Sequence, residues 1–346
     1  MRTCRLVLAG VGNIGGGFLR IVARKQEFLS NQHGLRLCPV AVVDSSGVAL
    51  KASGLDIDEI LRLKHAGSGV AAYPHCGMPG ATTLDALGEA SADMLIECSP
   101  TNLEDGEPGL SAIAWALSHG IDVVTANKGP LVLAYQRLVE LAAQGRASLR
   151  FSGAVAGGLP TVNIGQRDLV GAEILRVEGI FNTTTNYILM RMDEDGLSFE
   201  DALAEAQQAG VAEADPTLDI DGWDPANKLV IVANSVLLMP ATLQDVSVQG
   251  IRGIGRAQLI QAREDGRAVK LLVTAERETP SNYKLAVRPT ELPLEHPLAR
   301  LTKWQMGVVY TTDIMGVITA IIDAEGPTAT AAAVLRDVIN VLTARS

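Results

Sequence analysis

The amino-acid sequence predicts an α/β protein in which a parallel sheet covered by helices is followed by a mixed α+β domain. Between residues 4 and 128, short apolar segments typical of strands alternate with amphipathic segments typical of helices, as in βαβ units. From about residue 150 this alternation stops, and several strand-like segments follow one another around turns. A chain of 346 residues is long enough for two domains.

These patterns divide the chain into three expected parts. Residues 1–149 form the first domain, and residues 150–320 form the second. Residues 321–346 hold a last helix, rich in alanine and valine, that we expect to pack back on the first domain.

Composition limits the partners that this protein can have. Its net charge of −10 argues against nucleic acid or an anionic membrane surface as the main partner. No apolar run reaches the roughly 18 residues needed to span a membrane, and the chain enters a strand at once, without a signal peptide. The four cysteines show no CxxC spacing, which suits a reducing compartment. We therefore expect a cytoplasmic protein that acts on a small molecule.

The first strand-like segment runs directly into a glycine turn, GVGNIG, and then into a helix. In GxGxxG the first glycine permits a tight turn, and the second lets the backbone approach a pyrophosphate. The third glycine lets the helix pack closely on the strand, and the helix N-terminus attracts negative charge. The motif therefore predicts a Rossmann-type dinucleotide site with contacts from the whole turn: Gly10, Val11, Gly12, Asn13, Ile14 and Gly15.

The second strand-like segment, CPVAVVD, ends at Asp44. A carboxylate at this place can bind the hydroxyls of the adenosine ribose, although the spacing from the glycines exceeds the usual value of about 20 residues. Asp44 can also simply start an Asx turn. No arginine follows directly to meet a 2′-phosphate, so this region favours NAD over NADP, and both cofactors stay open.

Two later strands place polar residues at their ends. Residues 47–80 predict only a short helix and a loop, and after them the strand DMLIECS ends at Ser99 and the strand IDVVTAN ends before Lys128. Because the carboxyl ends of parallel strands meet at the ligand crevice, we expect Ser99 and Lys128 near the reactive end of the cofactor. Lys128 can equally be a surface lysine in a loop.

The second domain begins with a glycine turn, followed by a strand, a polar turn and a helix. Another helix precedes an acidic loop, and the segments 258–278, 283–293 and 307–322 read as strands around turns. These elements predict a mixed α+β domain.

The acidic loop from Gly210 leads into a helix that carries Lys228. Asp224 followed by Pro225 predicts an N-cap with proline at the first helical position. Lys228 then lies one turn further on the same face, so an acid and an amine stand side by side. Such a pair can bind an ammonium group and pass a proton, although the same spacing also occurs in ordinary helix capping.

Nine motifs, taken together and in order, resemble those of homoserine dehydrogenase, and the resemblance covers nearly the whole chain. It implies reversible oxidation of L-homoserine to L-aspartate 4-semialdehyde with NAD or NADP, a step of threonine and methionine biosynthesis. It also implies a catalytic second domain through which a homodimer forms. The motifs are GVGNIGGG, ECSPTNLEDGEPG, VVTANKGP, AVAGGLPT, GIFNTTTNYIL, AGVAEADPTLDIDGWDPANKL, HPLA, TTDIMG and GPTATAAAVLRDV.

The resemblance also implies roles for single residues. Lys228, beside Asp224, corresponds to the proton donor and acceptor at the substrate oxygen. Lys128 lies between nicotinamide and substrate and is a second candidate for that role. A nearby cation or burial lowers the pKa of an amine from about 10.4, whereas neighbouring acids raise it, so the sequence leaves both lysines open. The implied substrate contacts are Glu213, Asp219 and Thr184.

The family also binds a monovalent cation, sodium, through backbone carbonyls that correspond to Val155, Gly157 and Leu159. This sequence departs from the family at Ser152, where a glutamate usually completes the cation site. It also has Thr183 in place of a glycine, and a reduced glycine stretch, AEGPTA, before the last helix. The chain ends soon after that helix, so we expect the short form without a regulatory domain.

Two other functions compete with this interpretation. An enzyme like aspartate-semialdehyde dehydrogenase needs a cysteine nucleophile facing the second domain, and no cysteine follows Cys98. A non-catalytic dinucleotide sensor with the same fold is the second alternative, because a fold alone does not imply a function. The lysines and acids of the motifs argue against it.

Overall fold

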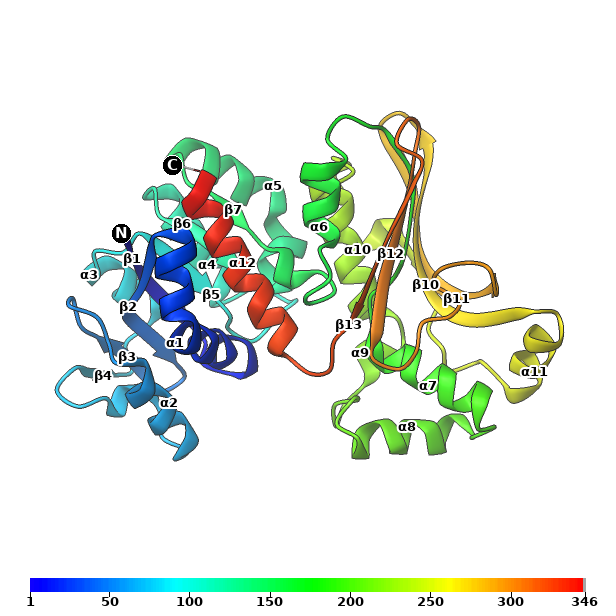
Figure 1. The fold of residues 1–346 in the computed structure, drawn as a ribbon, viewed down its shortest axis with the longest axis horizontal. Helices are drawn as coiled ribbons and strands as arrows, with labels where there is room; N and C mark the ends of the chain where they lie inside the picture. The colour runs from blue at the N-terminus through cyan, green and yellow to red at the C-terminus, as the bar shows by residue number, and fades with distance from the viewer. Residues whose placement is uncertain (345–346) are drawn as a thin grey trace. The chain divides into compact units, whose positions relative to one another are not determined.

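The computed structural model describes residues 1–344, which form two compact units (Figure 1). The first unit contains Met1–Gly158 and the last helix, and the second contains Leu159–Gly326. The boundaries therefore fall later than the expected 149/150 and 320/321. The reason is that the segment after residue 150 still bonds within the first unit: the amide of Ser152 donates to Asp337 of the last helix at 2.8 Å.

The first unit is built on a seven-stranded sheet with the order β4-β3-β2-β1-β5-β6-β7. The five strands from β2 to β7 in this order are parallel, which confirms the predicted α/β fold, whereas β3 and β4 are antiparallel. These two short strands were not predicted, because three or four residues are too few to show a periodicity. The strands are β1 (Arg2–Ala9), β2 (Leu35–Asp44), β3 (Gly47–Leu50), β4 (Gly77–Pro79), β5 (Met94–Glu97), β6 (Asp122–Thr125) and β7 (Leu149–Arg150).

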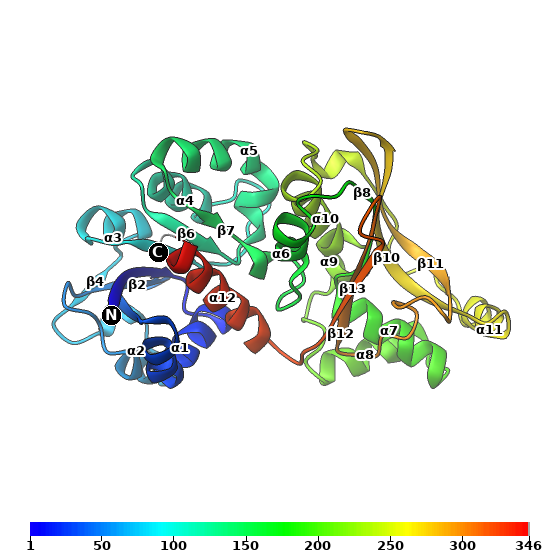
Figure 2. The same ribbon diagram turned by 45° about the horizontal axis from the view of Figure 1, so that its top comes forward.

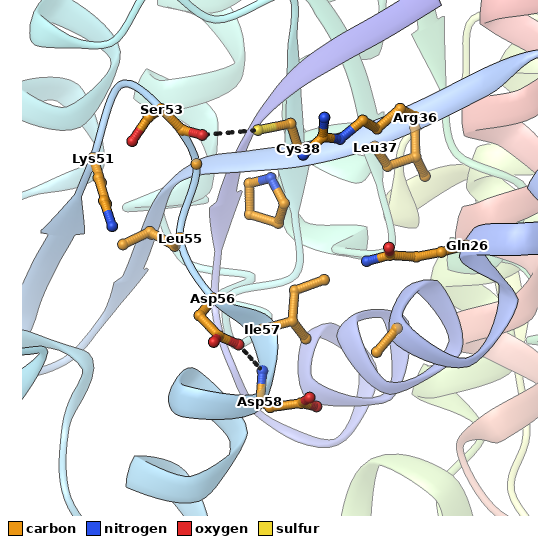
Figure 3. Close-up of a pocket in the computed structure, with 13 residues that line it drawn as sticks. Gln26, Arg36, Leu37, Cys38, Lys51, Ser53, Leu55, Asp56, Ile57 and Asp58 are labelled. Carbon is orange, nitrogen blue, oxygen red and sulfur yellow. Dashed lines mark hydrogen bonds between the residues drawn. The ribbon is translucent and has the colours of Figure 1, made fainter. Parts of the chain in front are cut away.

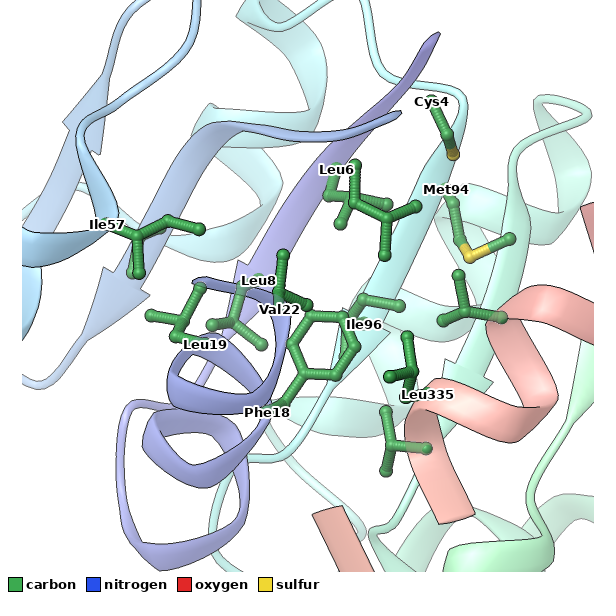
Figure 4. Packing of buried hydrophobic residues seen from close by; sticks show 14 of the residues in the cluster. Cys4, Leu6, Leu8, Phe18, Leu19, Val22, Ile57, Met94, Ile96 and Leu335 are labelled. Atoms are coloured by element: carbon green, nitrogen blue, oxygen red, sulfur yellow. The ribbon is translucent and has the colours of Figure 1, made fainter. Parts of the chain in front are cut away.

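Helices cover both faces of this sheet. On one face α1 and α12 lie side by side (Figures 1 and 2), and Phe18 and Leu335 from them pack with Leu6, Leu8 and Ile96 of the sheet (Figure 4). Full burial of each such side chain contributes about 1.5–3 kcal/mol, so this face anchors both helices. The helical segments are α1 (Asn13–His33), α2 (Ile57–His65), η1 (Val70–Ala72), α3 (Thr83–Glu89), α4 (Gly109–Ser118), α5 (Lys128–Gly145), η2 (Ser152–Ala154) and α12 (Thr328–Ala344).

The second unit is built on a six-stranded sheet with the order β13-β12-β8-β10-β11-β9. Its neighbouring strands are antiparallel except for β9 and β11, so the predicted mixed domain is confirmed. The strands are β8 (Ile174–Ile180), β9 (Val246–Val248), β10 (Arg267–Thr279), β11 (Asn282–Pro293), β12 (Gln305–Thr312) and β13 (Val317–Asp323).

The helix α10 packs against β10 and β11, and its residues 229–235 are all buried, which makes it a fixed platform. The helical segments of this unit are α6 (Thr161–Asn163), η3 (Ile164–Asp168), α7 (Thr183–Glu194), α8 (Phe199–Gln208), α9 (Thr217–Ile220), α10 (Trp223–Ser235), η4 (Leu243–Asp245) and α11 (Arg256–Glu264). Among the helices described here, none combines the length and the apolarity that a membrane span requires.

One prediction for the second unit was wrong. The start of the segment 258–278 was expected to be a strand, but it belongs to α11. Leu259 and Ala262 are its buried residues, and their separation of three positions follows a helical period. A glycine before the helix and Gly266 after it confine the helix and let β10 begin at once.

Candidate functional site

The glycine turn after β1 has the steric requirements that its motif predicts. Gly10 has a φ of +87°, and a Cβ there would lie 2.3 Å from the carbonyl oxygen of Cys98. A Cβ on Gly15 would lie 1.9 Å from the carbonyl oxygen of Gly10. No side chain fits at either position, so both glycines are needed for the turn itself and for the packing of α1 on β1.

Gly12, which begins α1 as its N-cap, differs from these two. A Cβ at this position would meet no atom of residues 1–344 within 4 Å. The helix has no acidic residue in its first turn, and Gly12 and Asn13 are exposed. A helix N-terminus carries unpaired N–H groups and partial positive charge, so this open place fits a pyrophosphate. The exposed N-terminus of α1, at Gly12 and Asn13, thus fits the phosphates of a dinucleotide.

Asp44, at the end of β2, already accepts several hydrogen bonds. Its carboxylate accepts from Lys64 Nζ at 2.6 Å, from the amide of Ser46 at 2.9 Å and from the amide of Val70 at 3.2 Å. Burial raises the pKa of Asp44, but the bonds from Lys64 and Ser46 lower it by more, so the pKa lies below its ordinary value. The bond from Ser46 forms the Asx turn that was one alternative, and ribose binding stays a prediction.

Lys64 is a cation that sequence reasoning missed in this region. No arginine follows Asp44 directly, which favoured NAD, yet an ammonium lies 2.6 Å from that carboxylate. It comes from α2, twenty residues further along the chain. The observation weakens the preference for NAD, and both cofactors remain candidates.

A buried carboxyl joins the ends of β5 and β6. Glu97 accepts from the amide of Ser99 at 2.9 Å and also from the Ser99 hydroxyl, and its other oxygen accepts from Thr125 Oγ1 at 3.1 Å. Burial raises the pKa of Glu97, while these hydrogen bonds oppose the rise. Sequence reasoning missed Glu97, although an acid at the end of an apolar strand, directly before a predicted site residue, was a usable signal.

This network reaches Lys128 through its neighbour Asn127. The amide of Asn127 donates to Thr125 Oγ1 at 3.0 Å, and its side chain donates to Ser99 Oγ at 3.3 Å. Asn127 also caps α5, where its Oδ1 accepts from the amide of Gly129 at 3.0 Å. Lys128 is the first residue of that helix. The predicted residues Ser99 and Lys128 are therefore held together at the carboxyl edge of the first sheet.

In the second unit, Lys228 and Asp224 form the pair that their spacing predicts. Lys228 Nζ donates to Asp224 Oδ2 at 2.6 Å and to the carbonyl oxygen of Phe181 at 2.6 Å. The two side chains are 13% and 10% exposed, so solvent screens the pair only weakly. The shared face of α10 brings them together, as expected for residues four apart.

The predicted role of Asp224 as an N-cap was wrong. The N-cap is Gly222, which has a φ of +86° and lets the chain turn from α9 into α10. Asp224 is the second residue of the helix, and Pro225 is the third. Proline is tolerated there because the amides of a first helical turn have no partner within the helix. The carboxylate of Asp224 accepts hydrogen bonds from Lys228 and from Asn182.

Asn182 links this pair to a second carboxylate. Its side-chain amide donates to Asp219 Oδ1 at 2.7 Å and to Asp224 Oδ2 at 2.9 Å, and its Oδ1 accepts from the amide of Thr185 as the cap of α7. Sequence reasoning missed this residue, although it lies in the quoted GIFNTTTNY turn. We call Asn182, Asp219, Asp224 and Lys228 the acid–amine cluster.

The surroundings of Asp219 in the acid–amine cluster raise its pKa above the ordinary value of an aspartate. Burial, followed by the nearby charge of Asp224, raises the pKa of Asp219. The charge of Lys228 and hydrogen bonds from Thr184 and Asn182 oppose this rise. Two carboxylates and one ammonium can therefore hold a second cation or take up a proton.

The two remaining substrate candidates differ in placement. Thr184 is 4% exposed and its hydroxyl donates to the carbonyl oxygen of Val211 at 3.1 Å, so it lies beside the cluster. Glu213 is exposed, and within residues 1–344 its carboxylate has no hydrogen bond or ion pair. The structure thus brings Thr184 to Asp219 but does not bring Glu213 into the cluster.

The turn that was expected to bind sodium is contacted by a positively charged side chain, that of Arg336 in α12. Arg336 donates to Ser152 Oγ at 3.0 Å and to the carbonyl oxygen of Gly158 at 3.3 Å. The hydroxyl of Ser152, in turn, donates to Asp337 at 2.8 Å. The carbonyl of Leu159, one of the three expected with Val155 and Gly157, accepts from an amide two residues on.

These contacts do not fit a sodium ion completed by residue 152. A serine whose hydroxyl donates to a carboxylate supplies no negative charge to a metal, and the guanidinium beside it repels one. Within the described part of the chain, no group of three or more histidine, cysteine or acidic residues is placed to bind a metal.

A cavity of about 470 Å³ lies elsewhere in the first unit (Figure 3). It runs along the amino-terminal half of β2, past Arg36 and Cys38, to the start of α2 at Asp56. None of the predicted site residues lines it, so it is not the candidate active site. The candidate functional groups are the glycine turn with the strand ends, in the first unit, and the acid–amine cluster, which is described separately in the second unit.

Comparison with known proteins agrees with this division. The family model of homoserine dehydrogenase matches residues 160–339, and the model of the homoserine dehydrogenase NAD-binding domain matches residues 10–152. A homoserine dehydrogenase of Methanocaldococcus jannaschii is 37% identical over 97% of this chain and 98% of its own length. An NAD(+)-dependent homoserine dehydrogenase of Pseudomonas canavaninivorans is 35% identical over 99% of this chain and 97% of its own length.

Solved structures give the same result. A putative homoserine dehydrogenase from Archaeoglobus fulgidus superposes with a TM-score of 0.88 at 34% identity, covering 98% of this chain and 99% of that one. A hyperthermophilic archaeal homoserine dehydrogenase in complex with NADPH gives a TM-score of 0.85 at 25% identity, covering 99% of this chain and 98% of that one. With both family models matched in order, and with relatives above 30% identity over nearly the full length, this chain belongs to the homoserine dehydrogenase family.

Proposed function

We propose that the protein interconverts L-homoserine and L-aspartate 4-semialdehyde with NAD or NADP, as a step of threonine and methionine biosynthesis in the cytoplasm. Membership of the family supports the reaction, and the four free cysteines suit a reducing compartment. The single observation that carries the proposal is the buried ammonium of Lys228, which bonds to Asp224 and to the carbonyl of Phe181.

The first unit holds the cofactor. The open N-terminus of α1 at Gly12 takes the pyrophosphate, and the strand ends with Ser99 and Lys128 serve the nicotinamide half. When bound, the oxidised cofactor supplies the hydride acceptor. Glu97 keeps this edge in place, because its carboxyl bonds both to Ser99 and to Thr125.

Lys228 accepts the proton of the substrate hydroxyl during oxidation and donates it during reduction. Oxidation of the alcohol requires the loss of that proton, and an amine that already donates to a carboxylate can receive one proton while it passes another to Asp224. In the reverse direction the ammonium donates to the aldehyde oxygen. Lys128 is the alternative proton carrier, and separate substitutions of the two lysines distinguish them.

The remaining acids bind the amino group of homoserine. Asp219 lies in the cluster next to Asp224 and Lys228, where its charge attracts an ammonium, and Thr184 fixes its orientation. Glu213 is exposed on the acidic loop and supplies a second negative charge to the substrate ammonium. Binding of a cationic group between these acids also offsets the repulsion that raises the pKa of Asp219.

The second unit also offers a surface for a homodimer. β13 is an edge strand of the sheet, and its exposed residues alternate along the strand, among them Val317 and Ile321 at 63% and 48% exposure. An open apolar edge favours pairing with another strand. Sedimentation of the wild-type protein and of Ile321→Lys tests this, and a monomeric wild-type protein would contradict it.

The deciding experiment follows the absorbance of the reduced cofactor when protein, L-homoserine and either NAD or NADP are mixed. Turnover with one or both cofactors is the expected result. Binding of a dinucleotide without turnover would instead support the non-catalytic sensor. The same assay with other short hydroxy amino acids measures the specificity for homoserine.

A further inference from the structure

Lys270, in the middle of the second sheet, is a buried cation that the proposed reaction does not use. It is 5% exposed, and its Nζ donates to Asn186 Oδ1 at 2.8 Å and to the carbonyl oxygen of Leu301 at 2.8 Å. Within residues 1–344 no carboxylate forms an ion pair with it. A buried charge without an opposite charge is costly, and an apolar side chain of similar length would cost less. Its position therefore calls for a role other than stability.

The charge of Lys270 fixes the orientation of Asn186. Because an ammonium only donates, Asn186 must present its oxygen to Lys270, and its nitrogen then donates to the carbonyl oxygen of Thr302 at 2.7 Å. The amine and the amide thus join three segments: β10, the first turns of α7 and the loop before β12. Lys270 lies three residues before Val273, the first residue of β10 that pairs with β8, and Val273 pairs with Gly179, close to where the chain leaves β8 for α7.

The first turns of α7 carry the groups that organise the acid–amine cluster. Asn182, one turn before Asn186 on the same face, is the residue that bonds to both Asp219 and Asp224. Thr184 in the same turn donates its hydroxyl to the carbonyl of Val211, at the start of the acidic loop that carries Asp219. A small rotation or shift of this turn would lengthen all of these bonds together. Lys270 of the sheet bonds to this turn at Asn186, and the carboxylates of the acid–amine cluster bond to it at Asn182.

We propose that Lys270 is a positioning residue for the homoserine side of the reaction, acting through Asn186 on the first turn of α7. This inference rests on the proposed function for its kinetic part. Removal of the ammonium frees the Asn186 amide to turn and loosens Asn182, so homoserine binding weakens while binding of the dinucleotide in the first unit does not change.

Burial also makes the position sensitive to pH. It lowers the pKa of Lys270 to about 8, although the negative charges of Glu194 and Asp193 oppose the shift. Asp193 is itself paired with Arg263 of α11 at 2.7 Å, and Lys303 in the loop before β12 is exposed. Above pH about 8 the amine loses its charge, and its two hydrogen bonds become neutral and weaker.

The test compares Lys270→Met, Lys270→Arg and Asn186→Asp with wild type, and uses Lys284→Met on β11 as a control at an exposed lysine. For Lys270→Met we expect the KM for homoserine to rise about tenfold, with the KM for the dinucleotide unchanged. Lys270→Arg restores part of the loss because it keeps the charge, and the control behaves as wild type.

Asn186→Asp keeps the size of the side chain and gives Lys270 a carboxylate partner, although it removes the hydrogen bond to the carbonyl of Thr302. The pH profile of kcat/KM for homoserine is then expected to extend to higher pH, because the carboxylate raises the pKa of Lys270. This variant also keeps the inference testable if Lys270→Met fails to fold. Unchanged KM in a folded Lys270→Met, or an unchanged profile in Asn186→Asp, would overturn the inference.

A second readout does not depend on turnover. Hydrogen exchange of the full chain is expected to be at least tenfold faster at the amides of residues 185–187 in Lys270→Met than in wild type. If wild type fails to turn over homoserine, the proposed function is wrong, yet the exchange rates still decide whether Lys270 holds α7. If wild type is active and exchange is unchanged, the inference about Lys270 alone fails.

Discussion

The ammonium of Lys228 donates to the carboxylate of Asp224 at 2.6 Å, one turn away on the same face of α10. Residues 224–227 and 229–235 of the helix that carries both are buried, so neither side chain has much freedom to move away. This contact and the bond to the carbonyl of Phe181 hold the Lys228 side chain in one orientation, which suits a proton donor to the aldehyde oxygen. In the direction of oxidation the same contact provides the carboxylate that receives the proton.

Lys228→Met tests that role. Because positioned proton transfer contributes roughly 10²–10⁴-fold to rate, we expect kcat to fall by at least about 10²-fold. NADH titrated by fluorescence is expected to bind with wild-type affinity, since Lys228 lies in the other unit from the glycine turn. Lys128→Met, measured in parallel, is the matched comparison. A larger loss in Lys128→Met, with Lys228→Met nearly active, would transfer the role to Lys128.

Asp219→Asn and Glu213→Gln test how the amino group of homoserine is bound. Both remove a negative charge without changing shape. Asp219 lies within the cluster and Glu213 is exposed, so we expect the KM for homoserine to rise more in Asp219→Asn, by roughly tenfold, than in Glu213→Gln. Steady-state kinetics at fixed dinucleotide measures both. An unchanged KM in both variants would remove these acids from substrate binding.

Gly12→Val and Gly15→Ala separate cofactor binding from folding. A side chain at Gly12 meets no protein atom within 4 Å among residues 1–344, so we expect this variant to lose about 1 kcal/mol of stability or less and still fail to bind dinucleotide. At Gly15 a Cβ would lie 1.9 Å from the carbonyl oxygen of Gly10, so we expect Gly15→Ala to lose roughly 1–3 kcal/mol or more. Urea unfolding and NADH titration measure the two effects, and normal affinity in Gly12→Val would contradict the pyrophosphate site.

Sequence reasoning succeeded where the physical cause is local. Gly15 is required because a Cβ there would meet the carbonyl oxygen of Gly10, five residues earlier, and Lys228 meets Asp224 because helical geometry fixes neighbours four positions apart. The wrong N-cap shows the limit of this approach. Asp-Pro is a common helix start, but a glycine at a positive φ two residues earlier begins the helix first.

Residues whose partners lie far along the chain were missed. Asn182 bonds to acids 37 and 42 positions away, and Lys270 bonds to Asn186 across 84 positions. No spacing rule connects such residues, because the sheet order that brings them together is set by the whole second unit. Glu97 was missed for a related reason: its partner Thr125 follows a crossover helix.

Arg336 leads to a prediction about the dependence of the reaction on salt. Its guanidinium bonds to Ser152 Oγ and to the carbonyl of Gly158, so a fixed positive charge already lies at the turn that sodium binds in the family. We expect kcat/KM to differ by less than twofold among sodium, potassium and tetramethylammonium salts at equal ionic strength. Arg336→Met removes this charge, and we expect the variant to lose activity and to regain part of it with sodium or potassium but not with tetramethylammonium. A wild-type protein that requires sodium would show that the guanidinium does not replace the ion.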